Sequence, residues 1–312
     1  MEQCFYHIPV LLEPAVAGLN IQPDGIYVDA TFGGGGHSGE IIKHLSNNGH
    51  LYAFDQDADA LQNATRNDAG ALPLTADGRF TFVASNFRYL KNWMRYYGAE
   101  GVHGVLADLG VSSHHFDDEQ RGFSFRFDAP LDMRMNQHAL RSAAQVVNEA
   151  SADELTTIFR IYGELKNAPR LAQTIVRERA KGSIQTTHQL ASLLLPLCGH
   201  DREKKNLAKA FQALRIEVNH EMEALKEMLA AATELLVPGG RLVVISYHSL
   251  EDRMVKNLIR AGNMEGEVTQ DIFGNTDTPL RAIGKPIMPD ADELQANPRS
   301  RSARMRIAEK CG

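Results

Sequence analysis

The chain has 312 residues, of which 43% are hydrophobic and 23% are charged, and its formal net charge is −6. These values are typical of a folded globular protein of one large domain or two ordinary ones, and they exclude a disordered chain, a fibrous repeat and a disulfide-dependent scaffold. The net charge is −8 over residues 1–150, +4 over 151–220 and −2 over 221–312, which disfavours a polyanionic partner except at a local basic surface.

Strands and helices are predicted to alternate over the first 110 residues. Short β-branched and aromatic runs predict buried strands, and apolar residues at helical spacing predict helices between them. The expected strands are 26–32, 51–55, 79–84 and 102–109, and the expected helices are 38–45, 58–69 and 89–97. This alternation predicts βαβ units and a parallel sheet that is covered by helices on both faces.

Only helical signals occur from about residue 141 to residue 236. Capping boxes at Ser151 and Thr186 precede apolar runs, and a third helix is expected over 170–181. Residues 207–236 contain neither proline nor glycine, so a single helix of 30 residues is expected there. The sheet is therefore interrupted by a long helical segment.

The last part of the chain is expected to return to the sheet. Residues 241–246 and 302–308 have the composition of strands, and 262–300 are rich in Gly, Pro and Asp and are expected to be loops. The predicted fold is α/β, with a discontinuous sheet domain formed by two parts of the chain. These parts are residues 1–136 and 211–312, and an all-helical domain is inserted at 137–210.

Four glycines, Gly33 to Gly36, directly follow the first expected strand, and residues 34–39 match the pattern G-x-G-x-x-G. Glycine lets the backbone approach a ligand closely. Between a strand and a helix, such a loop binds the pyrophosphate of a dinucleotide or lies under the amino-acid and ribose parts of S-adenosylmethionine. A plain tight turn is the alternative, and the position of the loop favours a nucleotide-like ligand.

Two acidic residues are placed at the ends of expected strands. Asp55 follows Gly35 by 20 residues, the spacing of a carboxylate that accepts hydrogen bonds from ribose hydroxyls. Asp108 ends the fourth strand, and ligands of open α/β sheets bind outside the carboxyl ends of the strands. The glycine loop, Asp55 and Asp108 are thus expected to converge. Alternatively, these acids cap turns or helices, a role for which Asp57 is better placed.

Four further segments each allow two interpretations. His114–Asp118 could bind a metal or form a solvated loop, and His248–Asp252 could line a site or start a helix. Phe123, Phe125 and Phe127 could stack on a base or pack as a strand on a core. The arginines at 299, 301, 304 and 306 could meet phosphate or be the solvated side of a strand.

Eight motifs, taken together, closely resemble those of the MraW/RsmH family over nearly the whole chain. They are His7-x-x-Val10-Leu11-Leu12, Asp29–Ser38, Asp108–Ser113, Arg121–Phe125, Pro130–Met135, Phe211–Ile216, His248–Arg253 and Asn297–Ser302. The resemblance implies a class I (Rossmann-like) methyltransferase sheet with an inserted helical domain. It implies transfer of a methyl group from S-adenosylmethionine to the exocyclic N4 of a cytosine in 16S ribosomal RNA.

The resemblance also implies a set of cofactor contacts and a partner. The contacts are expected at Gly35, Gly36, His37, Asp55, Phe87, Asp108 and His115. The partner is small-subunit ribosomal RNA or the assembling small subunit, and the chain acts either alone or as a homodimer. A cytoplasmic location fits this partner. It also fits the three cysteines, which are far apart and odd in number, and the lack of a signal peptide or of about 18 consecutive apolar residues. No metal site is expected.

The chemistry leaves two roles open for Asp108. Methyl transfer from a sulfonium is an in-line displacement, and the amine of cytosine is a poor nucleophile that benefits from a proton acceptor. Many amino-methyltransferases place Pro-Pro after the residue that holds the amine, whereas Asp108 is followed by Leu109-Gly110-Val111. Asp108 is therefore expected either to hold the cofactor or to act in catalysis.

Two other functions remain open from the residues alone. The glycine pattern also fits an NAD-linked oxidoreductase. The basic segment also fits a non-catalytic ribosome-assembly factor that binds RNA. If the chain is a methyltransferase, the inserted domain is expected to contact RNA through residues such as Lys204 and Lys205.

Overall fold

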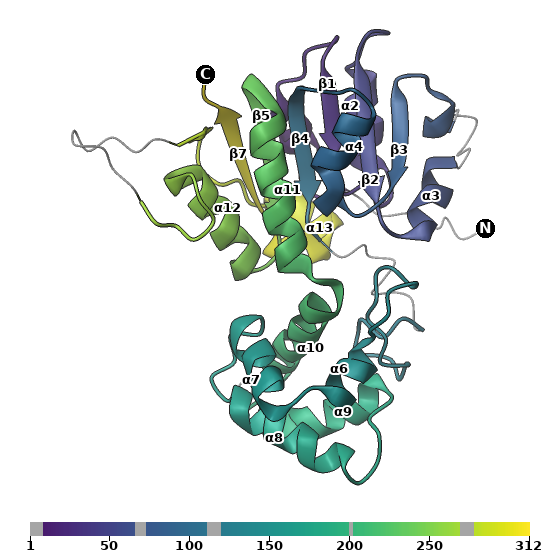
Figure 1. Cartoon of the computed structure of the whole chain (residues 1–312), viewed down its shortest axis with the longest axis vertical. Coiled ribbons are helices and arrows are strands. Elements are labelled where there is room, and N and C mark those ends of the chain that lie inside the picture. Colours follow the sequence, from purple (N-terminus) through teal and green to yellow (C-terminus); the bar gives the residue numbers. More distant parts are fainter. Residues whose placement is uncertain (1–8, 66–72, 111–119, 200–201, 269–277) are drawn as a thin grey trace. The chain divides into compact units, whose positions relative to one another are not determined.

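The chain folds into two compact units in a computed structural model that describes residues 9–65, 73–110, 120–199, 202–268 and 278–312. The first unit combines residues 1–110 and 222–312 and holds the sheet, and the second unit spans residues 111–221 and is helical (Figure 1). The second unit is wider than the 137–210 expected for the insert.

The wider bounds of the second unit have a physical cause. Phe123, Leu131 and Met133 precede the expected insert, yet their side chains are buried in the hydrophobic core of the helical unit. At the other end, the helix that carries Phe211 and Leu214 into the same core continues to Asn219.

The first unit is built around seven strands. The strands are β1 Ile26–Asp29, β2 His50–Asp55, β3 Phe80–Ala84, β4 Val102–Asp108, β5 Leu236–Ser246, β6 Leu280–Ala282 and β7 Arg304–Lys310. The helices are α1 Leu12–Leu19, α2 Gly36–Lys43, α3 Ala58–Thr65, α4 Leu90–Tyr96, α11 Glu221–Leu235, α12 Ser249–Ala261 and α13 Ala291–Ala296. Short 3-10 helices are η1 Leu74–Ala76, η2 Phe87–Tyr89 and η5 Pro298–Ser302.

The strands lie in the order β3-β2-β1-β4-β5-β7-β6. The pairs from β3 to β5 are parallel, whereas β7 pairs antiparallel with both β5 and β6. The α/β class and the Rossmann-like sheet expected from the sequence are confirmed. The chain order reverses at β1, between β2 and β4, and ligands of such sheets bind at this reversal, beyond the carboxyl ends of the strands.

Helices cover the sheet on both faces, as the strand–helix alternation predicted. Successive strand residues alternate between two cores, so that Tyr27, Leu106 and Ile245 face one side and Val28 and Val105 face the other. The first core includes residues of α1, α2 and α3, and the second includes residues of α4, α11 and α12. Both faces are buried, which explains the nearly continuous hydrophobic runs of the central strands.

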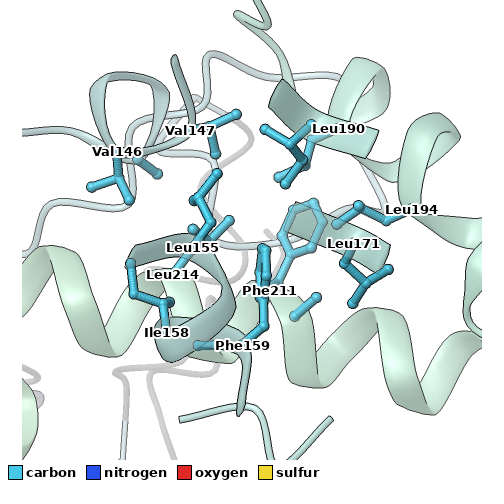
Figure 2. Close-up of a cluster of buried hydrophobic side chains, with 14 of the residues drawn as sticks. Val146, Val147, Leu155, Ile158, Phe159, Leu171, Leu190, Leu194, Phe211 and Leu214 are labelled. Atoms are coloured by element: carbon cyan, nitrogen blue, oxygen red, sulfur yellow. The ribbon is translucent and has the colours of Figure 1, made fainter. Parts of the chain in front are cut away.

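The second unit is a bundle of helices. Its described elements are α6 Ala143–Glu149, α7 Ala152–Ile161, α8 Ala168–Arg179, α9 Thr187–Leu194, the 3-10 helix η3 Leu195–Leu197 and α10 Glu203–Asn219. Their apolar faces meet in one core, in which Leu155, Phe159, Leu190 and Leu214 are fully buried (Figure 2). The capping boxes expected at Ser151 and at Thr186 are confirmed and begin α7 and α9.

Several elements differ from the sequence prediction. The single helix expected over 207–236 is wrong: α10 ends at Asn219, and His220 adopts a left-handed φ of 50° before α11 begins. No glycine or proline marks this break. The helix α1 was not predicted, and the short strand β6 and the helix α13 lie where only loops were expected.

Residues near the end of α11 also differ from expectation. The fifth strand begins at Leu236 rather than 241, and its pairing with β4 shifts between Val102 and Gly104. Pro238-Gly239-Gly240 therefore forms an irregularity within the strand, where Gly239 has a φ of 80°. Among the described helices, none is long and apolar enough to cross a membrane.

Candidate functional site

The glycine loop joins the end of β1 to the start of α2. Gly33 and Gly35 have φ values of 53° and 79°, in the left-handed region that glycine tolerates best. A Cβ atom added at Gly35 would lie 2.7 Å from the ring of Phe32, and one at Gly36 would lie 2.6 Å from Pro9. The loop therefore has no room for a side chain at Gly35 and Gly36, and it leads directly into the first turn of α2.

Asp29, the last residue of β1, fixes the residues on both sides of this loop by hydrogen bonds. Its carboxylate is 1% exposed and accepts hydrogen bonds from the Ser38 hydroxyl at 2.6 Å and from the Thr31 backbone N–H at 3.1 Å. Burial raises the pKa of Asp29, and the charge of His37 and the Ser38 hydrogen bond oppose that rise. Asp29 was expected only as part of a motif, although its position at the end of a strand, four residues before Gly33, was a usable signal.

Asp55, at the end of the neighbouring strand β2, is hydrogen-bonded to the glycine loop. Its Oδ2 atom accepts a hydrogen bond from the Gly33 backbone N–H at 2.8 Å, and its Oδ1 atom accepts one from the Asp57 N–H at 2.9 Å. Asp57 in turn accepts from the N–H of Asp59 at 3.1 Å, so Asp57 caps the start of α3. The structure therefore brings Asp55 and the glycine loop together and leaves the helix cap to Asp57.

Asp108, at the end of β4, is fixed by two neighbours. Its backbone N–H donates to the Thr31 hydroxyl at 2.7 Å, which ties β4 to the loop after β1. The Tyr247 hydroxyl, just beyond β5, donates to Asp108 Oδ1 at 2.8 Å. Burial and the neighbouring Asp108 carboxylate raise the pKa of Tyr247 far above its ordinary value, so the phenol stays protonated and donates.

Tyr247 was missed by the sequence analysis. Its ring lies against Gly110, where an added Cβ would come within 2.8 Å of a ring carbon. Asp108 and Tyr247 are 139 residues apart, and they meet because β4 and β5 are neighbours in the sheet. The available signal was the position of Tyr247 at the carboxyl end of a strand.

The other expected cofactor residues are placed differently. The ring of His37 is buried, and its Nε2 atom lies 3.1 Å from the carbonyl oxygen of Val10, so the side chain holds the segment before α1. A ligand contact of His37 would fall to its backbone N–H in the first turn of α2. Phe87 lies in η2, after β3, and packs partly buried against a sheet core. His115 lies outside the described residues, as does the rest of the segment 114–118.

The phenylalanine motif is part of the core of the helical unit. Phe123 is buried, and Phe125 packs edge-on against Phe211 with ring centroids 5.3 Å apart. Phe127 is 38% exposed. The sequence allowed these residues to pack as a strand on a core. They do not form a strand, so that expectation is wrong, but the packing of Phe123 and Phe125 on a core is confirmed.

The remaining motifs also serve local structure. His248 is the N-cap of α12, and Glu251 completes a capping box with it, so this motif starts a helix, which was one of its two interpretations. Asp252 forms ion pairs with Arg304 and Arg306 at 3.0 and 2.7 Å, so these two arginines bind a carboxylate of their own unit. The other two arginines of that motif lie on η5 and are exposed.

Comparison with known proteins identifies the family. Residues 4–311 match a family model described as the MraW methylase family. The chain belongs to this family. The resemblance inferred from the eight motifs is thereby confirmed over almost the full length.

Curated relatives of this MraW methylase family member cover the whole chain. It is 60% identical over 306 residues to the ribosomal RNA small subunit methyltransferase H of Phocaeicola vulgatus, and the match covers 98% of this chain and 97% of the relative. It is 59% identical over 310 residues to the protein of the same name from Bacteroides fragilis, with 99% of both chains covered. A putative rRNA methylase structure from Clostridium thermocellum matches with a TM-score of 0.45 and 15% identity, over 97% of this chain and 99% of that one.

Proposed function

We propose that this protein transfers a methyl group from S-adenosylmethionine to the exocyclic N4 of a cytosine in small-subunit ribosomal RNA. The observation that carries the proposal is membership of the MraW methylase family over residues 4–311, together with full-length relatives named ribosomal RNA small subunit methyltransferase H. The choice of the N4 atom of cytosine rests on the motifs that the chain shares with the family.

The carboxyl edge of the sheet is suited to S-adenosylmethionine. The loop at Gly35 and Gly36 has no room for side chains, so its backbone can approach a ligand closely. Asp55 lies beside this loop, where its carboxylate can also accept hydrogen bonds from ribose hydroxyls. When bound, the cofactor would supply the methyl group on a sulfonium. The residues proposed to hold it are Gly35, Gly36, His37, Asp55, Phe87, Asp108 and His115.

We assign Asp108 first to cofactor binding. Its N–H is bonded to Thr31 in the loop after β1, which places its carboxylate at the same edge of the sheet as Asp55. The Pro-Pro pair that would mark a loop for holding an amine is absent after Asp108. In the alternative role, Asp108 would accept a hydrogen bond from the cytosine amine and receive its proton as the nitrogen becomes methylated.

The helical unit is proposed to recognise RNA while the sheet unit performs the chemistry. The target cytosine has to be unstacked before its amine can reach the methyl group, and RNA-modifying enzymes favour such accessible bases. Ribosomal RNA and its assembling subunit are cytoplasmic, so we propose that location for the chain. A homodimer is a second proposal, which light scattering at several protein concentrations tests.

Nucleoside mass spectrometry tests the proposed reaction. Ribosomal RNA from cells that lack this protein should lose one N4-methylated cytidine, and the purified protein with S-adenosylmethionine should restore it. Loss of the modification without restoration by the purified protein would favour a non-catalytic assembly factor. A nicotinamide cofactor that copurifies with the protein would favour an oxidoreductase instead.

A further inference from the structure

Two helices of the second unit begin beside the same short segment. The side chain of Asn167, the N-cap of α8, donates to the carbonyl oxygen of Leu197 at 2.7 Å. The side chain of Asn206, in the first turn of α10, donates to the carbonyl oxygen of Cys198 at 2.8 Å. The starts of α8 and α10 are therefore neighbours, although they are 35 positions apart in the sequence.

Five cationic residues, which we name the basic surface, lie at these two helix starts. They are Lys166, Arg170, Arg202, Lys204 and Lys205, and all five are exposed. None takes part in an ion pair with any residue that the structure describes.

The opposite end of α8 is different. There, Arg177 and Lys181 are also exposed, but both pair with Glu178, at 2.8 Å each. Close to the basic surface in sequence, the acidic residues of the described chain are Glu164 and Glu203, so the cations outnumber them. The basic surface thus concentrates positive charge that forms no ion pair with the described residues of the unit.

The position of these cations lowers the stability of the helices that carry them. A helix N-terminus has partial positive charge, so each cation near it costs stability, by about 0.3–1 kcal/mol where it is effective. Two other helices of this chain follow the opposite rule: Asp153 and Glu154 lie in the first turn of α7, and Glu251 and Asp252 lie in that of α12. In α10, Glu203 is the one acid of the first turn and Lys204 and Lys205 follow it directly. Departures from such local rules are expected at functional or strained sites.

We infer that the basic surface binds the phosphodiester backbone of the RNA substrate. The inference rests on the proposed function and names the part of the helical unit that meets RNA. Lysines and arginines on phosphates orient a nucleic acid without reading its sequence, and each contact releases counterions. An acidic protein segment is less suited, because the buried centre of a protein interface is more apolar than other surface. The described residues of this turn offer one exposed large apolar side chain, Leu195, which is 36% exposed.

Three variants of the full chain test this inference. The first is Arg202→Gln/Lys204→Gln/Lys205→Gln on α10, and the second is Lys166→Gln/Arg170→Gln at the start of α8. The control, Arg177→Gln/Lys181→Gln, removes the same charge as the second variant from the far end of α8, which is about 18 Å long. All changed side chains are exposed, so folding should persist.

The probe is an unmodified 16S ribosomal RNA transcript, whose affinity is measured at several salt concentrations. The first variant should bind at least about tenfold more weakly at 0.1 M salt, and the slope of log K against log salt should fall by about two to three. The second variant should lose affinity and slope in the same direction, whereas the control should stay within about twofold of the unchanged protein. The affinity for S-adenosylmethionine should be unchanged in all three.

Other outcomes separate this inference from the proposed function. Normal RNA affinity in both surface variants, with methyl transfer intact, would overturn the inference alone. Equal losses in the control would mean that overall charge acts rather than this surface, and would also overturn it. Weakened binding of poly-glutamate without weakened RNA binding would assign the surface to an acidic protein. Failure of the unchanged protein to methylate the RNA would overturn the proposed function as well.

Discussion

The carboxyl edge of the sheet and the basic surface use their charged residues in opposite ways. At the sheet edge, Asp29, Asp55 and Asp108 are each held by hydrogen bonds from backbone or hydroxyl groups at 2.6–3.1 Å. On the basic surface, the side chains of five cations are exposed. The ligand proposed for the sheet edge would therefore be recognised by fixed geometry, whereas the RNA proposed for the basic surface would be attracted by charge. The first kind of site is sensitive to single atoms and the second to ionic strength.

The largest effect is expected for Asp55→Ala. The variant loses the carboxylate proposed for the ribose hydroxyls, and it loses the bond that holds Gly33 in the loop. A charge-assisted hydrogen bond is worth about 1.5–3 kcal/mol, so the dissociation constant of S-adenosylmethionine should rise by about 10- to 150-fold. Calorimetry on the folded variant measures it.

Two further variants control this measurement. Asp55→Asn keeps one oxygen that can accept from the loop, so it should lose less affinity than the alanine variant. Asp24→Ala removes an exposed carboxylate that precedes β1 and bonds to Ser46, and it should bind the cofactor normally. Unchanged affinity in Asp55→Ala would remove Asp55 from the cofactor site.

Salt should separate the two sites in the unchanged protein. If about four phosphates are contacted, single-stranded RNA should bind about 50-fold more weakly when salt rises from about 50 to 200 mM. The affinity for S-adenosylmethionine should change by less than about twofold, because the carboxylates proposed to hold it are themselves fixed by short hydrogen bonds within the protein and salt screens such groups less. Equal salt dependence of both ligands would contradict the contrast between the two regions.

Asp108→Asn should have an intermediate effect. Asn can still accept a hydrogen bond, but it lacks the negative charge, so the dissociation constant of S-adenosylmethionine should rise by about tenfold. Single-turnover methyl transfer at saturating cofactor should stay near normal. The opposite result, normal binding with a transfer rate about a hundredfold lower, would make Asp108 catalytic rather than a cofactor ligand.

The smallest effect is expected for Tyr247→Phe, which removes the 2.8 Å hydrogen bond to Asp108 but keeps the ring against Gly110. Cofactor affinity should fall by about threefold, less than the whole value of one hydrogen bond, because the phenol acts through Asp108. The pKa of Tyr247 is raised above the ordinary tyrosine value of about 10, so its phenol stays protonated throughout the range from about pH 6 to 9. The difference in cofactor affinity between the two proteins should therefore be constant over this range. A difference that vanishes within this range would contradict the assignment.

Much of the fold was predictable because its signals are local. Alternating hydrophobic runs and helical periodicity located β1 to β5, and the capping boxes at Ser151 and Thr186 located two helix starts. The break at His220 was not predictable in this way, because a left-handed residue without glycine leaves no mark in composition. The extent of the helical unit was also misjudged, since Phe123 and Leu131 belong to its core only through contacts with helices later in the chain.

In the candidate site, too, some residues were predictable from local sequence and others were placed only by contacts between distant segments. The sequence determined the glycine loop and the acids at the strand ends, because a tight turn needs glycine and the end of a strand follows from its hydrophobic run. Only the tertiary structure placed Tyr247 on Asp108, because that contact depends on which strands are neighbours. It also brought the starts of α8 and α10 together, through the bonds of Asn167 and Asn206 to consecutive carbonyl groups. Contacts between distant segments depend on how whole elements pack, which no local pattern of residues records.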